Sequence, residues 1–169
     1  LADVAIGDSI AVAGVCLTAV TLDAAHFGVD ISAETLARTT LGALRAGAAV
    51  NLEKSLLLAD RLGGHLVSGH VDGIGCVAAV RDEGASQRWT FSAPQALLRY
   101  IAVKGSVCID GTSLTVNEVA GDTFGVTLIP HTLAVTTFGG RKIGDAVNLE
   151  VDLVARYVER LASANIGMP

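Results

Sequence analysis

The sequence repeats itself at an offset of 97 residues, and this internal repeat constrains the fold more than any other feature. Residues Ser9–Glu53 align with Ser106–Glu150 without a gap, and 19 of the 45 aligned positions are identical. Solenoid repeats have periods of about 20–50 residues, so the longer offset indicates a duplicated domain. We therefore expect the 169 residues to form two small domains.

Each copy of the repeat is predicted to consist mostly of β-strands. Val and Thr recur with a period of two, for example at Thr123–Ile129 and Ala146–Val151. One short helix is expected in each copy, at Ser32–Arg38 with its first residue as N-cap, and in a helix that begins with Pro130. Several short strands and one small helix per copy indicate a compact antiparallel barrel with Greek-key connections.

Residues 54–105 lie between the aligned segments, and their counterpart in the first copy would start before Leu1 at the same offset. The first copy is therefore expected to lack about its first third. Within this region, Pro94 is predicted to open a helix. The pairs Asp72-Gly73 and Asp110-Gly111 are predicted to form turns.

The residues after the second copy, Val154–Ala164, are predicted to form an amphipathic helix. Apolar residues at i, i+3, i+4, i+7 and i+8 form one stripe: Val154, Tyr157, Val158, Leu161 and Ala162. Two alternatives remain open, because the stripe can pack on its own domain or join the subunits of an oligomer.

The composition excludes several classes of protein. With 51% hydrophobic and 17% charged residues, the chain is not intrinsically disordered. The mean hydropathy of +0.53 raises the question of a membrane segment, but the uncharged stretch Ser9–Leu22 is too short and polar to cross about 30 Å of hydrocarbon. No secretory signal is visible, and a net charge of −5 argues against a nucleic-acid partner.

The cysteines and histidines indicate neither a disulfide framework nor a metal site. Cys16, Cys76 and Cys108 are odd in number and form no CxxC pair, which favours the reducing cytoplasm. His65 and His70 are five residues apart, a spacing that fits neither face of a helix, and no carboxylate cluster accompanies them.

Several motifs in the two copies carry a resemblance to a known family. They are Gly14–Thr18 (GVCLT), Val50–Glu53 (VNLE), Gly63–Gly75 (GGHLVSGHVDGIG), Lys104–Val116 (KGSVCIDGTSLTV) and Ile129–Gly139 (IPHTLAVTTFG). Together with the repeat, they resemble the riboflavin synthase family of the alpha-chain type, from about Val4 to Leu161. Family members begin with a Met-Phe-Thr-Gly stretch that lines the first barrel's pocket, and this stretch is missing here.

The resemblance implies an all-β fold of two tandem six-stranded Greek-key barrels followed by a C-terminal α-helix. It assigns a first lumazine-binding barrel, truncated at its N-terminus, to residues 1–62, and a second to residues 63–153. Residues 154–169 would form a trimerisation helix and tail.

The resemblance also implies a reaction. Two molecules of 6,7-dimethyl-8-ribityllumazine dismutate by transfer of a four-carbon unit, giving riboflavin and 5-amino-6-ribitylamino-pyrimidinedione, without a cofactor or metal. The family forms homotrimers in which each active site joins the first barrel of one subunit to the second barrel of another. The expected partners are therefore two lumazine molecules per site and two further copies of the chain, with no nucleic acid or membrane and a cytoplasmic location.

Cys16 and Ser113 are the leading catalytic candidates, and they occupy equivalent positions in the repeat. Two otherwise similar pockets thus differ at one nucleophilic or polarisable group, as distinct donor and acceptor roles require. The alternative is that both are ordinary packed strand residues. His70 is the third candidate, because an unperturbed imidazole pKa of about 6.5 suits proton transfer, whereas His65 is expected to be structural.

Further residues are assigned to substrate binding by the resemblance. In the first copy they are Ser9, Leu17, Thr18, Asp30, Ile31, Ser32, Ala33, Glu34 and Thr35. In the second copy and the segment before it they are Gly69, Val71, Lys104, Asp110, Leu114, Thr115, Ile129, Pro130, His131, Thr132, Leu133 and Ala134.

Three rival functions are weighed against the enzyme. A non-catalytic lumazine- or flavin-binding protein of the same fold would need only one intact pocket, whereas both appear intact here. An interaction protein that assembles through the tail helix would leave both polar clusters unexplained. A flavin reductase would need a following dinucleotide domain, for which no residues are expected.

Overall fold

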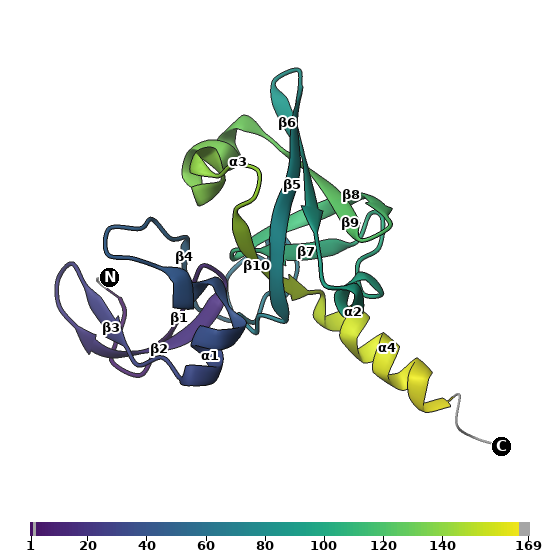
Figure 1. The fold of residues 1–169 in the computed structure, drawn as a ribbon. Coiled ribbons are helices and arrows are strands. Elements are labelled where there is room, and N and C mark those ends of the chain that lie inside the picture. Colours follow the sequence, from purple (N-terminus) through teal and green to yellow (C-terminus); the bar gives the residue numbers. More distant parts are fainter. Residues whose placement is uncertain (2, 166–169) are drawn as a thin grey trace.

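The computed structural model describes Leu1 and residues 3–165. Two β-units lie side by side, and a C-terminal helix extends from the second of them (Figure 1). The first unit is purple and blue in that view, the second is teal and green, and the helix α4 (Leu153–Asn165) is yellow.

The first unit is an open antiparallel sheet with one short helix. Its elements are β1 (Ser9–Val12), β2 (Val15–Leu22), β3 (Phe27–Val29), α1 (Ala33–Arg38), the 3-10 helix η1 (Thr40–Ala43) and β4 (Leu52–Lys54). The strand order is β3-β2-β1-β4. Helix α1 begins where predicted, because the Oγ of Ser32 accepts the Thr35 N–H at 3.1 Å and satisfies a free donor of the first turn.

The second unit is a closed barrel. Its elements are β5 (Gly73–Glu83), β6 (Ser86–Ser92), α2 (Gln95–Leu98), β7 (Ser106–Ile109), β8 (Thr112–Ala120), β9 (Thr123–Leu128), α3 (Pro130–Val135), the 3-10 helix η2 (Thr137–Gly140) and β10 (Ala146–Val151). The six strands close in the order β10-β5-β6-β9-β8-β7. Trp89, Phe91, Phe124 and Phe138 are buried in its core, so most of the chain's few aromatic side chains stabilise this one barrel. The predicted all-β class is confirmed.

Four strands of the first unit have equivalents in the second unit at the repeat offset of 97 residues. Strands β1, β2, β3 and β4 correspond to β7, β8, β9 and β10, and α1 corresponds to α3. In the barrel, β5 and β6 join β10 to β9. The described residues before β1 form no strands equivalent to these two, so β3 and β4 remain the edges of the first sheet.

The duplication extends to the irregularities of the strands. The register of β2 against β3 shifts between Ala19 and Thr21, and that of β8 against β9 shifts between Val116 and Glu118, which are the equivalent positions. Such β-bulges bend a strand and increase its twist. A Cβ added at Gly125 would lie 2.6 Å from a Glu118 carboxylate oxygen, so this bulge requires a glycine opposite it.

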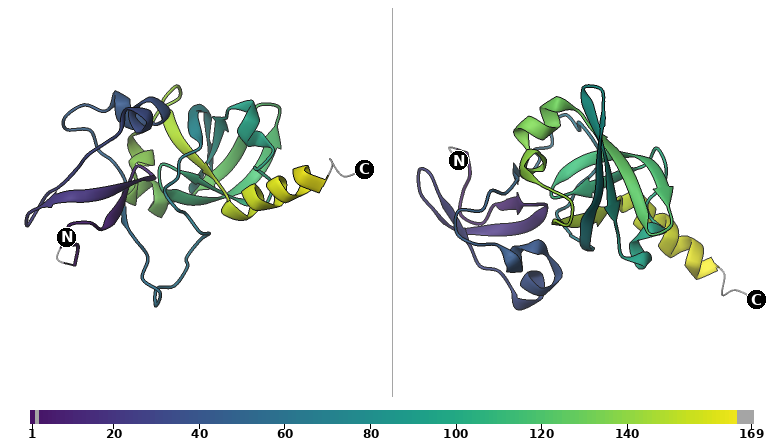
Figure 2. Two further views of the ribbon diagram at one scale, coloured as in Figure 1. Left: turned by 90° about the horizontal axis from the view of Figure 1, so that it is seen from below. Right: turned by 45° about the horizontal axis from the view of Figure 1, so that its top comes forward.

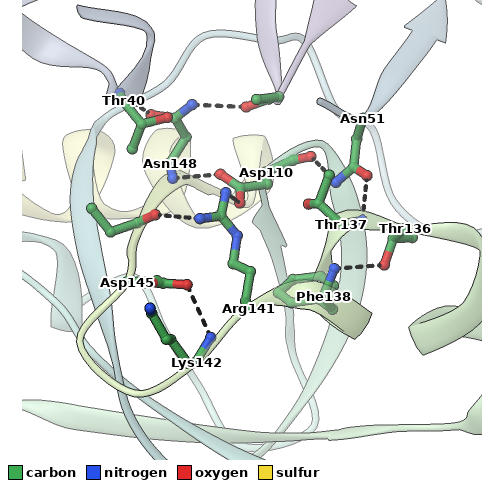
Figure 3. A network of polar contacts seen from close by, with 12 residues as sticks. Thr40, Asn51, Asp110, Thr136, Thr137, Phe138, Arg141, Lys142, Asp145 and Asn148 are labelled. Atoms are coloured by element: carbon green, nitrogen blue, oxygen red, sulfur yellow. Dashed lines mark hydrogen bonds and ion pairs between the residues drawn. The ribbon is translucent and has the colours of Figure 1, made fainter. Parts of the chain in front are cut away.

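Two asparagines join the units through reciprocal contacts (Figure 3). The Nδ2 of Asn148, on β10, donates to the Ala13 carbonyl of the first unit at 2.8 Å. Its Oδ1 accepts the Thr40 N–H at 2.8 Å. With only 1% of its surface exposed, Asn148 satisfies both ends of its amide across the interface.

The equivalent residue of the first unit, Asn51, makes the same two contacts in the opposite direction. Its Nδ2 donates to the Asp110 carbonyl at 2.9 Å, and its Oδ1 accepts the Thr137 N–H at 2.9 Å. Asp110 and Thr137 lie 97 positions after Ala13 and Thr40. The two units are therefore related by an approximate two-fold axis at this interface.

Two equivalent hairpin turns meet at the same axis. Ala13-Gly14 and Asp110-Gly111 all have positive φ, between 46° and 85°, which is the conformation of a type I′ turn. A Cβ added at Gly111 would lie 3.0 Å from the Gly14 amide nitrogen, so glycine also permits the close approach of the two turns. The predicted turn at Asp110-Gly111 is confirmed.

The predicted turn at Asp72-Gly73 is wrong. Gly73 begins strand β5, and the Asp72 carboxylate accepts the Val151 N–H at 2.9 Å from the end of β10. The same carboxylate forms an ion pair with Arg156 of α4 at 2.8 Å. Asp72 thus uses its side chain to join the barrel to the helix and does not form a local turn.

The predicted C-terminal helix is confirmed as α4, and its apolar stripe faces away from its own barrel. The polar side of α4 contacts the barrel, since Glu159 pairs with Arg99 at 3.0 Å and accepts the Tyr100 hydroxyl at 3.3 Å. The stripe residues are 61–66% exposed: Val154, Tyr157, Val158 and Leu161. Packing of the stripe on its own domain is therefore wrong, and both views of Figure 2 show α4 extending beyond the barrel.

Candidate functional site

The long segment between β4 and β5 covers a cavity where the two units meet. This segment loops out from the sheets in the left view of Figure 2. The cavity has a volume of about 310 Å³, which falls at the lower end of small-molecule sites. Its lining comes from both units and from the connecting segment: Ser9, Ala11, Cys16, Glu53, Lys54, Ser55, Leu56, Leu62, Gly63, Gly64, His65, Val67, Ser68, Gly69, Gly111 and Ser113.

Both leading catalytic candidates line this one cavity. Cys16 on β2 precedes Leu17, which is buried in the first core, and Ser113 on β8 precedes Leu114, which packs against the barrel core. Because side chains alternate along a strand, Cys16 and Ser113 point away from the cores. The equivalence that the repeat predicts therefore brings a thiol and a hydroxyl to the walls of one cavity.

Cys16 rests against the connecting segment at Gly69. The Cys16 N–H donates to the Gly69 carbonyl at 2.8 Å. Gly69 has a φ of +76°, and a Cβ on it would lie 2.6 Å from the Cys16 Cβ. The connecting segment can approach Cys16 this closely only because residue 69 lacks a side chain.

The position of Gly69 depends on Glu150 of β10. One carboxylate oxygen of Glu150 accepts the Ser68 N–H at 2.8 Å and the Ser68 hydroxyl at 2.7 Å. The other oxygen accepts the Gly69 N–H at 3.0 Å. Glu150 is 3% exposed, whereas its repeat equivalent Glu53 is exposed and lines the cavity.

Ser113 contacts a histidine of the same segment. The Nδ1 of His65 lies 2.7 Å from the Ser113 Oγ, and the His65 backbone N–H donates to the same oxygen at 3.3 Å. Partial burial lowers the pKa of His65, although Asp152 and Glu150 oppose this shift. The imidazole is therefore neutral near pH 7, and its Nδ1 can accept the Ser113 hydroxyl proton.

The histidine expected to handle protons lies elsewhere. His70 is exposed and does not line the cavity, whereas His65, expected to be structural, contacts Ser113. The pair Gly63-Gly64 before His65 is the signal that sequence reasoning could have used. A Cβ at Gly64 would lie 2.7 Å from the Ser113 Cβ, so glycine marks the close contact.

The structure brings only some of the predicted substrate-binding residues to this cavity. Ser9 and Gly69 line it. Leu17 and Leu114 belong to the cores, Val71 packs against the first core, and Asp110 is buried at the interface of the units. Ile31 and Leu133 also pack against the two cores. The others lie on the exposed faces of β2 and β8, in the turn before β7, and directly before or within α1 and α3: Thr18, Asp30, Ser32, Ala33, Glu34, Thr35, Lys104, Thr115, Ile129, Pro130, His131, Thr132 and Ala134.

Asp110 takes part in a buried ion pair behind the cavity wall (Figure 3). Its side chain has no exposed surface, contacts the Arg141 guanidinium at 2.5 Å and accepts the Asn148 N–H at 2.8 Å. Burial raises the pKa of Asp110, while the Arg141 charge and the Asn148 hydrogen bond oppose that shift. The equivalent position in the first unit is Ala13, so this ion pair belongs to the second unit alone.

Sequence reasoning missed most of the lining that the connecting segment supplies. Ser55, Leu56, Leu62, Gly64 and Val67 line the cavity, yet the repeat offset gives this segment no counterpart within the chain. Within Leu1 and residues 3–165, no three His, Cys, Asp or Glu side chains are grouped so that they could hold a metal ion. Among the helices of that same part of the chain, none is both long and apolar enough to cross a bilayer.

Comparisons with known proteins agree with this architecture. The family model described as the lumazine binding domain matches residues 2–55 and 68–152. A solved structure of LumP complexed with riboflavin superposes with a TM-score of 0.82 at 25% identity, covering 89% of this chain and 82% of that one. The structure of LumP complexed with 6,7-dimethyl-8-(1'-D-ribityl) lumazine superposes with a TM-score of 0.80 at 24% identity. This match covers 89% of this chain and 81% of that one, and it shows that the two proteins share a fold. Fold and family match together define a lumazine-binding barrel protein.

Similar sequences narrow this class further. Riboflavin synthase of Photobacterium phosphoreum is 50% identical over 161 residues, which are 95% of this chain and 74% of that protein. Riboflavin synthase of Brucella abortus (strain 2308) is 51% identical over 162 residues, or 93% of this chain and 80% of that protein. The chain belongs to the riboflavin synthase family, and it is a transferase of that type.

Proposed function

We propose that Cys16 and Ser113, which line the cavity where the two units meet, each act on one of the two lumazine molecules of the riboflavin synthase reaction, in sites that neighbouring subunits complete. One 6,7-dimethyl-8-ribityllumazine transfers a four-carbon unit to another in this reaction. The observation that carries the proposal is that two residues equivalent in the repeat both line this cavity. A duplicated fold offers one binding surface to each of two identical substrates, and holding both in a reactive geometry is worth about 7–11 kcal/mol of the barrier.

The difference between the two residues supports distinct roles for the two substrates. Cys16 carries a polarisable nucleophile, whereas Ser113 carries a hydroxyl whose proton neutral His65 can accept. We infer that Cys16 stabilises, or delivers a nucleophile to, one lumazine ring. Ser113 hydrogen-bonds the other ring or assists the loss of a proton from its methyl group, which conjugation with the ring acidifies.

We also propose that the chain works as a homotrimer with sites shared between subunits. The exposed apolar stripe of α4 supports this assembly, because ion pairs hold the opposite side of the helix to its own barrel. His70 is exposed in a single chain, which suits a proton-handling role toward a ligand of a neighbouring subunit. The three cysteines are free, in keeping with the proposed cytoplasmic location.

The experiment that tests the function needs only the protein and its substrate. Incubation with 6,7-dimethyl-8-ribityllumazine in the presence of EDTA should yield one riboflavin for every two lumazines consumed. Absence of riboflavin would contradict the enzymatic proposal. Tight binding without turnover would support the second candidate, a carrier, which the structural likeness to LumP bound to the lumazine and to riboflavin brings into consideration.

Substitution of the two candidates tests their roles. Cys16→Ala and Ser113→Ala should each lower kcat by about a hundredfold or more, in the range typical of a lost acid–base group. The free energy of unfolding, measured in urea, should change by less than about 1 kcal/mol because neither side chain lies in a core. Equal losses of stability and activity would support packing roles instead.

A further inference from the structure

A chain of hydrogen bonds links Glu150 of β10 to Cys16 of β2, and the roles proposed for Cys16 and Ser113 do not account for it. Glu150 accepts three hydrogen bonds from two successive residues, Ser68 and Gly69, and the Gly69 carbonyl then accepts the Cys16 N–H. A buried carboxylate is costly unless donors surround it. Here all three donors come from the segment that covers the cavity, so the carboxylate and that segment hold each other in place.

We propose that Glu150 is a positioning residue of the reaction, because its carboxylate sets the place of the Ser68–Gly69 peptide and this peptide fixes Cys16 at the cavity wall. The inference rests on the proposed role of Cys16 and adds a residue that does not touch the substrate cavity. Glu150 itself is absent from the cavity lining, whereas Ser68, Gly69 and Cys16 are part of it.

The first unit offers a comparison, because it carries a glutamate at the equivalent position in an open sheet without a covering Ser68–Gly69 segment. Glu53 occupies the equivalent position at the end of β4, and its side chain is exposed. Glu150 differs because Ser68 and Gly69 cover it, at a sequence separation of more than 80 residues. The contact with the connecting segment therefore contributes to the burial of Glu150, together with the place of β10 between β5 and β7 of the closed barrel.

The contact between Gly69 and Cys16 transmits the position of Glu150. Gly69 touches Cys16 through a hydrogen bond of 2.8 Å and through a backbone that leaves no room for a Cβ. A shift of the Ser68–Gly69 peptide therefore moves the Cys16 backbone or opens the cavity beside it. Displacements of about 1 Å at a reacting group can reduce rates by about a hundredfold.

Glu150→Gln is a sharp test because it keeps the shape of the side chain and replaces one acceptor oxygen with an NH₂ donor. The glutamine oxygen can still accept from Ser68, but its NH₂ group then faces the Gly69 N–H, so two donors oppose each other. Ser68→Ala removes only the hydroxyl bond and should have a smaller effect in the same direction. Gly69→Ala forces a Cβ to 2.6 Å from Cys16 and should have the largest effect.

The readout combines kinetics with labelling of individual thiols. We expect Glu150→Gln to lower kcat by about tenfold with a change in KM of less than about threefold, since the loss concerns positioning and not binding. The rate at which iodoacetamide alkylates Cys16, followed by mass spectrometry of its peptide, should rise severalfold. Glu83→Gln, at a half-buried ion pair of the β5–β6 hairpin away from the cavity, serves as the control and should change neither value.

Cys108 reports opening of the barrel core beside Glu150 within the same molecules. It pairs with Glu150 across β7 and β10, it is buried, and burial raises the pKa of its thiol to about 12. Faster labelling of Cys16 with Cys108 unreactive supports the proposal. Labelling of both thiols, or wild-type behaviour of Glu150→Gln in both assays, would overturn it.

The same experiments also cover a Glu150→Gln variant that fails to fold and a wild-type protein that is inactive. If Glu150→Gln fails to fold, the Ser68→Ala variant tests the proposal. Labelling of Cys16 faster than in the wild type supports it, and labelling at the wild-type rate contradicts it. Labelling does not depend on turnover. A wild-type protein that makes no riboflavin would therefore contradict the proposed function, while the thiol data still decide whether Glu150 holds Cys16.

Discussion

The hydroxyl of Ser113 has two contacts with one residue, His65, and the protonation of that residue decides what the hydroxyl can do. A neutral imidazole accepts the hydroxyl proton at Nδ1, whereas an imidazolium only donates. Partial burial favours the neutral form and lowers the pKa of His65. The same shift makes both activity and stability depend on pH.

We expect the free energy of unfolding to fall as the pH drops below about 6.5, the unperturbed histidine value. The unfolded state takes up a proton there while folded His65 resists it, so protonation favours unfolding. Turnover should decline over the same acidic range because Ser113 loses its acceptor. Urea unfolding and initial rates at pH 5.5 and 7.5 measure the two effects.

His65→Asn is the matched variant for this prediction. It retains a side chain of similar reach but cannot be protonated in this range. Its unfolding free energy and its rate should vary less with pH than those of the wild type. Acid dependence identical to that of the wild type would show that another group controls both quantities.

At the scale of elements, local sequence signals predicted most of what is seen. The N-cap Ser32, the opening proline Pro130 and the apolar stripe of the tail correctly predicted three helices, because caps and periodicity act within a few residues. The connecting segment was not predictable in this way. Its position depends on hydrogen bonds to residues far along the chain, such as that from Ser68 to Glu150.

The same distinction explains the unexpected contact of His65 and the wrong turn at Asp72-Gly73. The resemblance and general imidazole chemistry point to His70, whereas the contact of His65 with Ser113 depends on a segment folded back over 48 positions. Asp72-Gly73 has the composition of a turn, but Val151 and Arg156, about 80 positions further along the chain, donate to the Asp72 carboxylate. Long-range contacts override local preference in both cases.

Helix α4 provides the prediction at this scale. Leu161→Asp and Tyr157→Asp place charges on the exposed apolar stripe, and they should convert a trimer to monomers, because burial of an unpaired charge is costly. Analytical ultracentrifugation or light scattering measures the mass. Arg160→Asp lies off the stripe and serves as the control. A wild-type protein that is monomeric at all concentrations would contradict the proposed trimer.

At the scale of the whole molecule, the two units are held together by equivalent contacts of unequal burial. Asn148 is almost fully buried, whereas Asn51 is half-buried. The second unit adds the Asp110–Arg141 ion pair beside its asparagine, and the first has no equivalent because Ala13 occupies that place. The interface is therefore symmetric in its contacts and asymmetric in burial and charge.

We expect Asn148→Ala to lower the free energy of unfolding by about 2–4 kcal/mol, because it leaves two interface partners unpaired at about 1–3 kcal/mol each. Asn51→Ala should cost less, since water can reach its partners. Urea denaturation of both variants and of the double variant measures these costs. Equal losses for the two single variants would contradict the proposed asymmetry.

The reciprocal asparagine contacts have the signature of an isologous interface, in which residue i of one body contacts residue j of the other and the reverse also holds. Separate copies would form such a pair only above a threshold concentration. A peptide connection makes the pairing intramolecular, with an effective concentration of the order of millimolar. A substitution in one unit can then remove a contact of the interface without the two units separating. This freedom explains how Cys16 and Ser113, or Ala13 and Asp110, can differ within one otherwise symmetric frame.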